Sequence, residues 1–296
     1  MSKIQWCDET INPVVGCSKI SAGCQNCYAE KMARRLACMN FYQYQDVIGV
    51  ERNGTIKGEW NGTTAFVPSE LEKPYRWKKP RTIFVSSMGD LFHDSVPFEW
   101  IDQVVACAAL NPQHTFILLT KRAERMKKYF CDSDLEDRIT EIWQGGDPDK
   151  ETWNIMLPLE NLILGVSVED QATADERIPV LLQIPAAKRF ISYEPAVGPV
   201  DFTEYFEKAD NGAPCPEIHQ IICGGESGPK ARCLNPYWVR SVRDQCEAAG
   251  TAFMFKQWSR WVGPGAGTVF GWFEPETGLP MLDGRTHTEL AWEVRK

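Results

Sequence analysis

The sequence lacks the features that mark membrane-spanning, secreted, disordered or strongly basic proteins. It has no run of about 18 apolar residues, and its start, Met1 to Cys7, lacks the apolar stretch of a signal peptide. Its 296 residues carry 40 acidic and 32 basic side chains, a net charge of −8, which argues against non-specific duplex binding through a large basic face. Apolar residues make up 43% and charged residues 24%, which is typical of a folded protein. We therefore expect a cytoplasmic α/β protein without a membrane partner.

Short apolar, β-branched runs recur along the chain, and each is followed by a polar turn and then a helical pattern. The runs are residues 82–86, 115–120, 162–168, 189–193, 220–223 and 252–255. Helices are predicted over residues 98–110, 171–182 and 236–249, the last one ending before Gly250. Such alternation is typical of a parallel sheet that is covered on both faces. We expect a partial or complete (β/α) barrel of six to seven parallel strands rather than an open sheet.

Three stretches do not follow this alternation. Residues 39–80 contain Asn53-Gly54 and several prolines, and are predicted to be an inserted loop region or lid. Residues 131–160, with glycines at 145 and 146, are predicted to be an excursion before the next strand. The barrel domain is expected over residues 1–258, and residues 259–296 form a small C-terminal extension whose glycine-rich stretch 263–267 suggests a hairpin. Tryptophans of this tail could stack on bases or pack in the core; they are Trp258, Trp261, Trp272 and Trp292.

Eleven cysteines, an odd number, are expected to be thiols or metal ligands rather than a closed set of disulfides. Cys17, Cys24 and Cys27 form a C-x6-C-x2-C cluster just before a helical stretch that begins near Tyr28. Three thiolates with an open fourth position suit a [4Fe–4S] cluster that keeps one iron free for a ligand. One alternative is a structural zinc ion closed by a distant fourth ligand such as Cys38 or His93. Another is a set of unrelated buried thiols.

Polar residues and glycines gather where the predicted strands end. They are Gly89, Asp90, Lys121, Arg122, Ser167, Glu169, Glu194, Gly224, Gly225, Glu226, Ser227, Lys256 and Gln257. In a (β/α) barrel the carboxyl ends of the strands carry the binding site, so these residues are candidates for contact with a ligand. The stretch Gly224–Gly228 would let a ligand approach the backbone closely, but it is neither a phosphate loop nor a dinucleotide fingerprint. Turn caps, strand-to-helix turns and surface salt bridges are the ordinary structural alternatives for these residues.

Several of these motifs resemble the radical S-adenosylmethionine superfamily and, more closely, the phage Gp37/Gp68 family. Besides Trp6, the matching stretches are Asn12–Cys17, Gly23–Glu30, Ser86–His93, Leu119–Arg122, Gly165–Glu169, Ser192–Pro195, Gly224–Gly228 and Phe255–Trp258. They span residues 6–258, which is most of the chain. One departure from the wider superfamily is the gap between the first two cysteines, which has six residues in this sequence instead of the usual three.

The resemblance implies that Cys17, Cys24 and Cys27 hold a [4Fe–4S] cluster whose free iron chelates the amino and carboxylate groups of S-adenosyl-L-methionine. One electron, from a donor such as flavodoxin or ferredoxin, would release methionine and a 5′-deoxyadenosyl radical, which abstracts hydrogen from a substrate. Further cofactor contacts are expected from residues near the strand ends and beside the cysteines. Gly89 and Asp90 would receive the ammonium group of the cofactor, and Ser167 and Glu169 would contact its ribose. Gly224, Gly225 and Ser227 would also contact the cofactor. Tyr28 would cover the cluster or the adenine, or pack in the core.

Two carboxylates are candidates for catalysis. Glu194 could be a proton donor or a substrate ligand, and Glu226 stands in the middle of the glycine-rich loop. Lys121, Arg122 and Lys256 could bind a phosphate or carboxylate on the substrate, for which a nucleotide or nucleic-acid base is expected. Two alternative functions stay open. One is a zinc-stabilised barrel that binds a partner without redox chemistry; the other is a hydrolase that uses Glu194 and Glu226 as a carboxylate pair.

Overall fold

The computed structural model describes residues 4–50, 56–145, 155–206, 217–260, 273–274 and 276–292. Several predicted features lie outside these ranges: the Asn53-Gly54 turn, the Gly146–Pro148 part of the expected excursion, the glycine-rich residues 263–267, Trp261 and Trp272. None of the described cysteines forms a disulfide, as expected. Within the same ranges, no helix has both the length and the apolar character needed to cross a bilayer.

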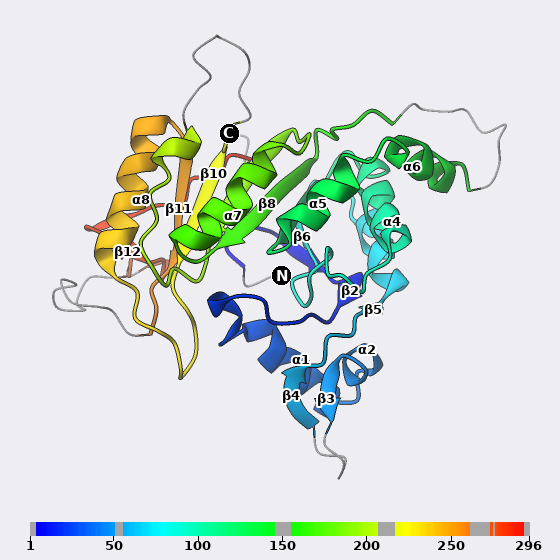
Figure 1. The fold of residues 1–296 in the computed structure, drawn as a ribbon, viewed down its shortest axis with the longest axis horizontal. Helices are drawn as coiled ribbons and strands as arrows, with labels where there is room; N and C mark the ends of the chain where they lie inside the picture. The colour runs from blue at the N-terminus through cyan, green and yellow to red at the C-terminus, as the bar shows by residue number, and fades with distance from the viewer. Residues whose placement is uncertain are drawn as a thin grey trace. The chain divides into compact units, whose positions relative to one another are not determined.

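Seven strands form one sheet in which the order of the strands follows the chain (Figure 1). They are β1 (Glu9–Ile11), β6 (Thr82–Val85), β7 (Thr115–Thr120), β8 (Leu162–Val168), β9 (Lys188–Tyr193), β10 (Gln220–Gly224) and β11 (Ala252–Gln257). The pairings of β1 with β6, β6 with β7, β9 with β10 and β10 with β11 are parallel. Because β1 and β11 end this order, the sheet is a partial (β/α) barrel, which confirms the expected fold class.

The apolar runs became strands because their side chains are buried on both faces of the sheet. All seven residues of β8 and all five residues of β10 are buried. The observed strands agree with the predicted ranges to within two residues at each end. Strand β1 was not predicted, since its three residues, Glu-Thr-Ile, are too few and too polar to show a pattern.

Two compact units make up the chain. The first contains Met1–Ile20, Cys27–Leu164 and Ile184–Ala187, and the second contains Ser21–Asn26, Gly165–Gln183 and Lys188–Lys296. Strand β8 therefore begins in the first unit and continues into the second. The domain boundary predicted near residue 258 stays a prediction.

In the first unit, helix α4 (Phe98–Ala109) follows β6 and presents apolar side chains to the core, among them Ile101 and Val105, both 0% exposed. Asn161 fastens the end of this helix to the start of β7, because its amide donates to the carbonyls of Ala108 at 2.9 Å and His114 at 3.0 Å. Helix α5 (Ala123–Phe130) follows β7 and buries Met126 and Tyr129.

The predicted inserted region is largely folded and packs against helix α1 (Tyr28–Cys38), also in the first unit (Figure 1). It contains α2 (Tyr42–Gln45), the antiparallel pair β3 (Ile48–Val50) and β4 (Ile56–Trp60), β5 (Ala65–Phe66), η2 (Pro68–Glu72) and α3 (Lys73–Arg76). Ala33 and Ala37 of α1 form a small core with Tyr44, Val47 and Ile48. Helix α1 and this hairpin therefore support each other.

Helix α6 (Leu135–Gln144) lies where the sequence predicted an excursion. Its apolar face buries Leu135 and Ile139, and it ends at Gly145, which has a φ of +61°. The predicted excursion before β8 therefore includes a helix, and Gly145 is its stop signal. The rest of the predicted excursion as far as residue 154 lies outside the described residues.

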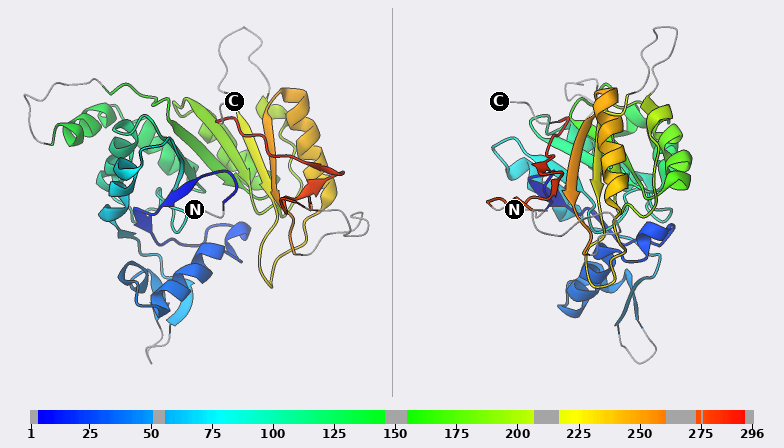
Figure 2. Two further views of the ribbon diagram at one scale, coloured as in Figure 1. Left: turned by 180° about the vertical axis from the view of Figure 1, so that it is seen from behind. Right: turned by 90° about the vertical axis from the view of Figure 1, so that its left-hand side faces the viewer.

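In the second unit, helix α8 (Pro236–Ala249) packs against β10 and β11 (Figure 2, right). It begins after Asn235, whose side chain accepts from the backbone N–H of Tyr237, and it ends at Gly250, which has a φ of +73°. Helix α7 (Gln171–Leu182) begins with a capping box formed by Asp170 and Thr173. A short hairpin, β12 (Met281–Leu282) with β13 (Arg285–Thr286), lies in the predicted C-terminal extension.

Candidate cofactor site

The residues predicted to gather at strand ends do follow the carboxyl ends of their strands. In the first unit, Asp90 comes shortly after β6, and Arg122 lies two residues beyond β7. In the second unit, Glu169 directly follows β8, Glu194 follows β9, and Gly225 follows β10. Because the strand pairs within each unit are parallel, neighbouring ends lie on one edge, where side chains can contact one another.

Cys17 lies in the loop after β2 (Val14–Val15), and the glycine before it fixes the path of this loop. Gly16 has a φ of +96°, and a Cβ there would lie 2.3 Å from the carbonyl oxygen of Thr63, so only glycine fits. The guanidinium of Arg122 lies beside the Cys17 thiol, with 3.7 Å between Nη1 and Sγ. A cation next to sulfur stabilises the thiolate, which is the form that binds metals.

A buried ion pair with Asp90 fixes the guanidinium of Arg122. Nη1 lies 2.8 Å from Oδ2, and each side chain is only 8% exposed. Asp90 also accepts from the hydroxyl of Thr120 at 2.7 Å and from the backbone N–H of Phe92 at 3.0 Å. Burial lowers the pKa of Arg122, but the negative charges of Asp90 and Cys17 outweigh burial, so the pKa is raised and the guanidinium stays charged. Asp90, which was predicted to meet an ammonium group, is therefore already paired with a cation.

The two fourth ligands considered for zinc have different surroundings. His93 is 5% exposed, and its nitrogens lie 2.8 Å from the hydroxyl of Ser18 and 2.9 Å from that of Ser95. Burial and the charge of Arg122 lower the pKa of His93, which keeps the ring neutral. Cys38 is the last residue of α1, which begins directly after Cys27. Ten residues of helix rise about 15 Å, so Cys38 and Cys27 lie at opposite ends.

Tyr28 and Gly89 lie beside the cysteine loop in the first unit. Tyr28 is 52% exposed, so it does not pack in the core, and its hydroxyl donates to the carbonyl of Ser87 at 2.8 Å. A Cβ at Gly89 would lie 2.9 Å from the carbonyl oxygens of both Val14 and Gly16. Gly89 is therefore needed for the close approach of two backbones, whatever it contributes to a ligand.

Cys24 belongs to the second unit, in the segment Ser21–Asn26, which contains the short helical turn η1 (Ala22–Cys24). The hydroxyl of Ser21 lies 3.6 Å from the Cys24 sulfur and donates to Oε1 of Glu169 at 2.9 Å. Glu169 is 0% exposed, and its Oε2 lies 3.2 Å from Nη1 of Arg177. The carbonyl of Ser167 accepts from the same nitrogen at 2.8 Å. Glu169 and Ser167, predicted to meet a ribose, thus both contact Arg177.

Glu226 is engaged by an arginine and by the segment that carries Cys24. Its Oε2 accepts from the backbone N–H of Arg232 at 2.8 Å and from the side-chain amide of Asn26 at 3.1 Å. Burial raises the pKa of Glu226, but the hydrogen bonds from Arg232 and Asn26 outweigh burial, so the pKa is lowered. A general acid needs a raised pKa, so this environment argues against Glu226 as the proton donor of a hydrolase.

Glu194 and Lys256, which were predicted as separate functional groups, form one ion pair with 3.0 Å between Nζ and Oε1. A Cβ at Gly224 would lie 2.6 Å from that same Oε1, and a Cβ at Gly225 would lie 2.5 Å from the backbone nitrogen of Ser259. The backbone contact therefore requires a glycine at 225, whereas at 224 the carboxylate end of Glu194 would have to move. Their contact with a cofactor stays a prediction, as does that of the exposed Ser227.

The structure brings the predicted residues together in small groups. Arg122 joins Asp90 to Cys17, Lys256 joins Glu194, and Glu169 holds the segment of Cys24. Cys17 and Cys27 belong to the first unit, whereas Cys24 belongs to the second. In the part of the chain that the structure describes, no group of three or more His, Cys, Asp or Glu side chains is gathered as it would be around an ion. The convergence of the three thiols on one cluster stays a prediction.

Several residues of these networks could not be found from the sequence. Arg177 and Arg232 fix the two carboxylates, and Ser21 and Asn26 connect those carboxylates to the cysteine loop. Asn26 and Glu226 are 200 residues apart, so nothing local in the chain indicates their contact. The only available signal was the position of Asn26 between two cysteines of the motif.

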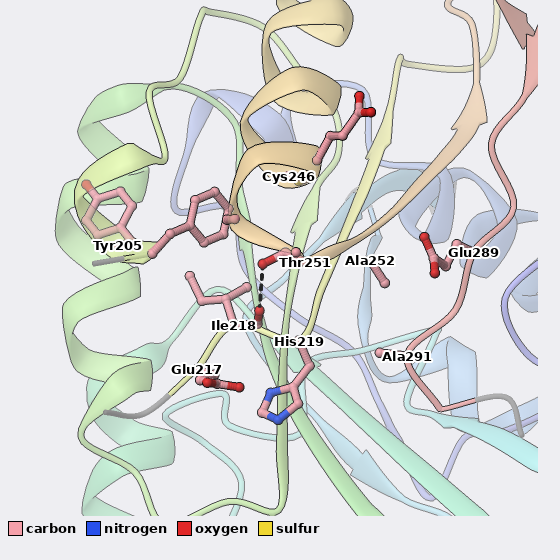
Figure 3. A pocket seen from close by; sticks show the side chains of 13 residues that line it. Tyr205, Glu217, Ile218, His219, Cys246, Thr251, Ala252, Glu289 and Ala291 are labelled. Carbon is pink, nitrogen blue, oxygen red and sulfur yellow. Dashed lines mark hydrogen bonds between the residues drawn. The ribbon is translucent and has the colours of Figure 1, made fainter. Parts of the chain in front are cut away.

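A pocket of about 690 Å³ in the second unit lies away from these residues (Figure 3). Its wall includes Ile218, His219 and Thr251, which directly precede β10 and β11, and the Thr251 hydroxyl donates to the Ile218 carbonyl at 3.1 Å. The pocket is therefore at the amino ends of these strands, whereas the predicted site residues follow the carboxyl ends. In barrel enzymes the amino end serves stability rather than catalysis.

No curated protein matches this chain. A solved structure of spore photoproduct lyase complexed with dinucleoside spore photoproduct has a TM-score of 0.42 and 8% identity, and the match covers 85% of this chain and 75% of that chain. A mutant of spore photoproduct lyase with bound AdoMet and dinucleoside spore photoproduct has a TM-score of 0.42 and 10% identity, covering 86% and 76%. The model of one family matches residues 1–291. Its description differs from the phage name that the motifs suggested: the chain belongs to the family described as "Protein of unknown function (DUF5131)".

Proposed function

We propose that this chain is a radical S-adenosylmethionine enzyme that abstracts hydrogen from a nucleotide or nucleic-acid base. The observation that carries the proposal is the cysteine motif. Cys17, Cys24 and Cys27 form no disulfide and lie in one short stretch of chain that leads into α1, at the head of a series of parallel β/α units. A three-thiolate set leaves one iron of a [4Fe–4S] cluster open to a ligand.

The surroundings of two of these thiols suit an anionic cluster. The charged guanidinium of Arg122 lies beside Cys17, and Cys27 occupies the N-cap position of the 11-residue helix α1. The amino end of a helix carries partial positive charge, so both positions place positive charge beside a bound anionic cluster. When bound, the cluster would supply one electron to S-adenosylmethionine, with flavodoxin or ferredoxin as the class of donor.

The other predicted residues have binding and positioning roles in this proposal. Arg122, fixed by Asp90, orients Cys17 and keeps a positive charge beside it. Tyr28 is exposed beside Cys27 and can cover the cofactor from the solvent side. Lys256 forms an ion pair with Glu194 and orients it at the end of β9, where the pair can bind polar groups of a substrate.

The proposal is tested by loading the full chain with iron and sulfide under anaerobic conditions. We expect about four irons per chain and, after addition of dithionite and S-adenosylmethionine, release of 5′-deoxyadenosine. Variants Cys17→Ala, Cys24→Ala and Cys27→Ala should each lose both properties, while Cys38→Ala, which changes an exposed thiol at the far end of α1, should keep them. A wild-type chain that binds zinc tightly and takes up no iron would support the zinc-stabilised alternative.

A further inference from the structure

The segment Ser21–Asn26, which carries Cys24, is held by two acidic side chains of the second unit. Oε1 of Glu169 accepts from the hydroxyl of Ser21 at 2.9 Å. Oε2 of Glu226 accepts from the amide of Asn26 at 3.1 Å, and the same amide donates to the carbonyl of Lys230 at 3.0 Å. Both ends of the segment are therefore fastened by a carboxylate.

Each carboxylate is itself fixed by an arginine. Glu169 pairs with Arg177, and the two side chains are 0% and 3% exposed. Glu226 pairs with Arg232, and Nη2 of Arg232 also donates to the carbonyl of Ala22 at 2.8 Å. Burying charges is costly unless they are paired and hydrogen-bonded. Three of these four charged side chains are largely buried, and Arg232 is 31% exposed, so their arrangement around one loop segment indicates a requirement for a defined loop position.

The close fit of Glu169 supports the same conclusion. A Cβ at Gly23 would lie 2.5 Å from Oε1 and from Cγ of Glu169, so the loop backbone runs directly over this side chain. With full burial and both oxygens engaged, Glu169 is better suited to hold the loop than to bind a ribose directly.

We propose that Glu169 and Glu226, each fixed by its arginine, are positioning residues that hold the loop carrying Cys24. This inference rests on the proposed function in so far as Cys24 is a cluster ligand. A loop with six residues between its first two cysteines has more conformations to lose than one with three, so it needs additional contacts to present its thiol in one place. The two ion pairs supply those contacts.

The test uses the full chain with the variants Arg232→Met and Glu169→Gln. The matched control is Asp283→Asn, which breaks the ion pair between Arg240 and Asp283 elsewhere in the same unit. The first readout is the alkylation rate of Cys24 by N-ethylmaleimide in the metal-free chain, relative to Cys38 in the same molecule. The second is the rate at which the anaerobically loaded chain releases iron to a chelator.

We expect both variants to raise the relative alkylation rate of Cys24 about tenfold or more, the change expected when a hydrogen bond to a charged group is lost. They should also release iron faster, whereas Asp283→Asn should match the wild type in both readouts. The conservative variant Arg232→Lys should restore part of the wild-type behaviour, because an ammonium group can still pair with Glu226.

The inference is overturned if the alkylation rate of Cys24 is unchanged in both variants, or if Cys24 and Cys38 become reactive in equal proportion, which would indicate general unfolding. Unchanged iron release from the loaded variants would also overturn it. If the variants expose Cys24 selectively but the wild-type chain takes up no iron, the positioning role is supported and the proposed function fails. The alkylation readout therefore separates the two failures.

Discussion

Replacing Arg122 by methionine would test whether the first unit depends on the ion pair beside Cys17. The substitution removes the guanidinium from Asp90, to which it lies at 2.8 Å, and from Ser18, whose hydroxyl it reaches at 2.9 Å. Methionine keeps a long, flexible side chain, so the cavity left behind is small. The main effect is a carboxylate that stays buried without its cation.

Removing one partner of a buried ion pair typically costs about 3 to 5 kcal/mol. Asp90 keeps hydrogen bonds from Thr120, at 2.7 Å, and from the backbone of Phe92, at 3.0 Å, so its charge is not left entirely without partners. We therefore expect the lower end of that range, about 3 kcal/mol of lost stability for the first unit. Adding Asp90→Asn should recover about 1 kcal/mol or more, because the uncompensated charge is then removed.

Native-state hydrogen exchange of the metal-free chain, followed by mass spectrometry on peptides from residues 82–130, measures this stability within the first unit. Arg76→Met is the control, since it breaks an exposed ion pair with side chains that are 72% and 61% accessible. It should change the stability by less than about 0.5 kcal/mol. If Arg122→Met changes the stability of the first unit by less than about 0.5 kcal/mol, the ion pair does not support this unit as described. The same follows if the double variant is no more stable than Arg122→Met alone.

Three further changes have defined outcomes. Tyr129→Phe removes the hydroxyl that donates to Asp102 at 2.7 Å in the core, and should lower the stability of the first unit by about 2 kcal/mol in the same exchange assay, with the 81% exposed Tyr42→Phe as control. Asp283→Asn should reduce the pH dependence of stability at acid pH. Hydrogen bonds from Arg240 lower the pKa of Asp283 to about 2, so its contribution to stability is present above about pH 4 and is lost as the pH falls towards 2. The free energy of unfolding, measured with urea at pH 5 and pH 3, should therefore change less in the variant, by under about 1 kcal/mol for so exposed a pair. Gly16→Ala should not be tolerated, because its Cβ would lie 2.3 Å from the Thr63 carbonyl, and it should lower both soluble yield and thermal midpoint.

The sequence predicted the sheet well because a strand that is buried on both faces consists of a continuous run of apolar residues. The seven apolar residues of β8 can be recognised without knowing what packs on them, and the stop at Gly250 follows from the conformation that glycine allows. Strand β1 is held by its parallel pairing with β6, which lies more than 70 residues later, and its own three residues contain no comparable signal.

The site was predictable only as far as residue types and strand ends. Glu169 and Glu226 were identified as functional candidates, but their contacts depend on Ser21 and Asn26, which are 148 and 200 residues away in the chain. Arg122 was expected to bind a phosphate or carboxylate of the substrate or to form a salt bridge; the structure pairs it with Asp90, beside Cys17, which no local pattern indicates. Such contacts follow from how distant strand ends meet, and a single sequence does not contain that information.

Electron paramagnetic resonance of the anaerobically loaded, dithionite-reduced chain, recorded before and after addition of S-adenosylmethionine, tests the central claim most directly. A site-differentiated [4Fe–4S] cluster held by Cys17, Cys24 and Cys27 should give the signal of a reduced cluster, and the signal should change when the sulfonium nucleoside binds the open iron. A chain that gives no cluster signal, or one whose signal does not change when S-adenosylmethionine is added, would contradict the account.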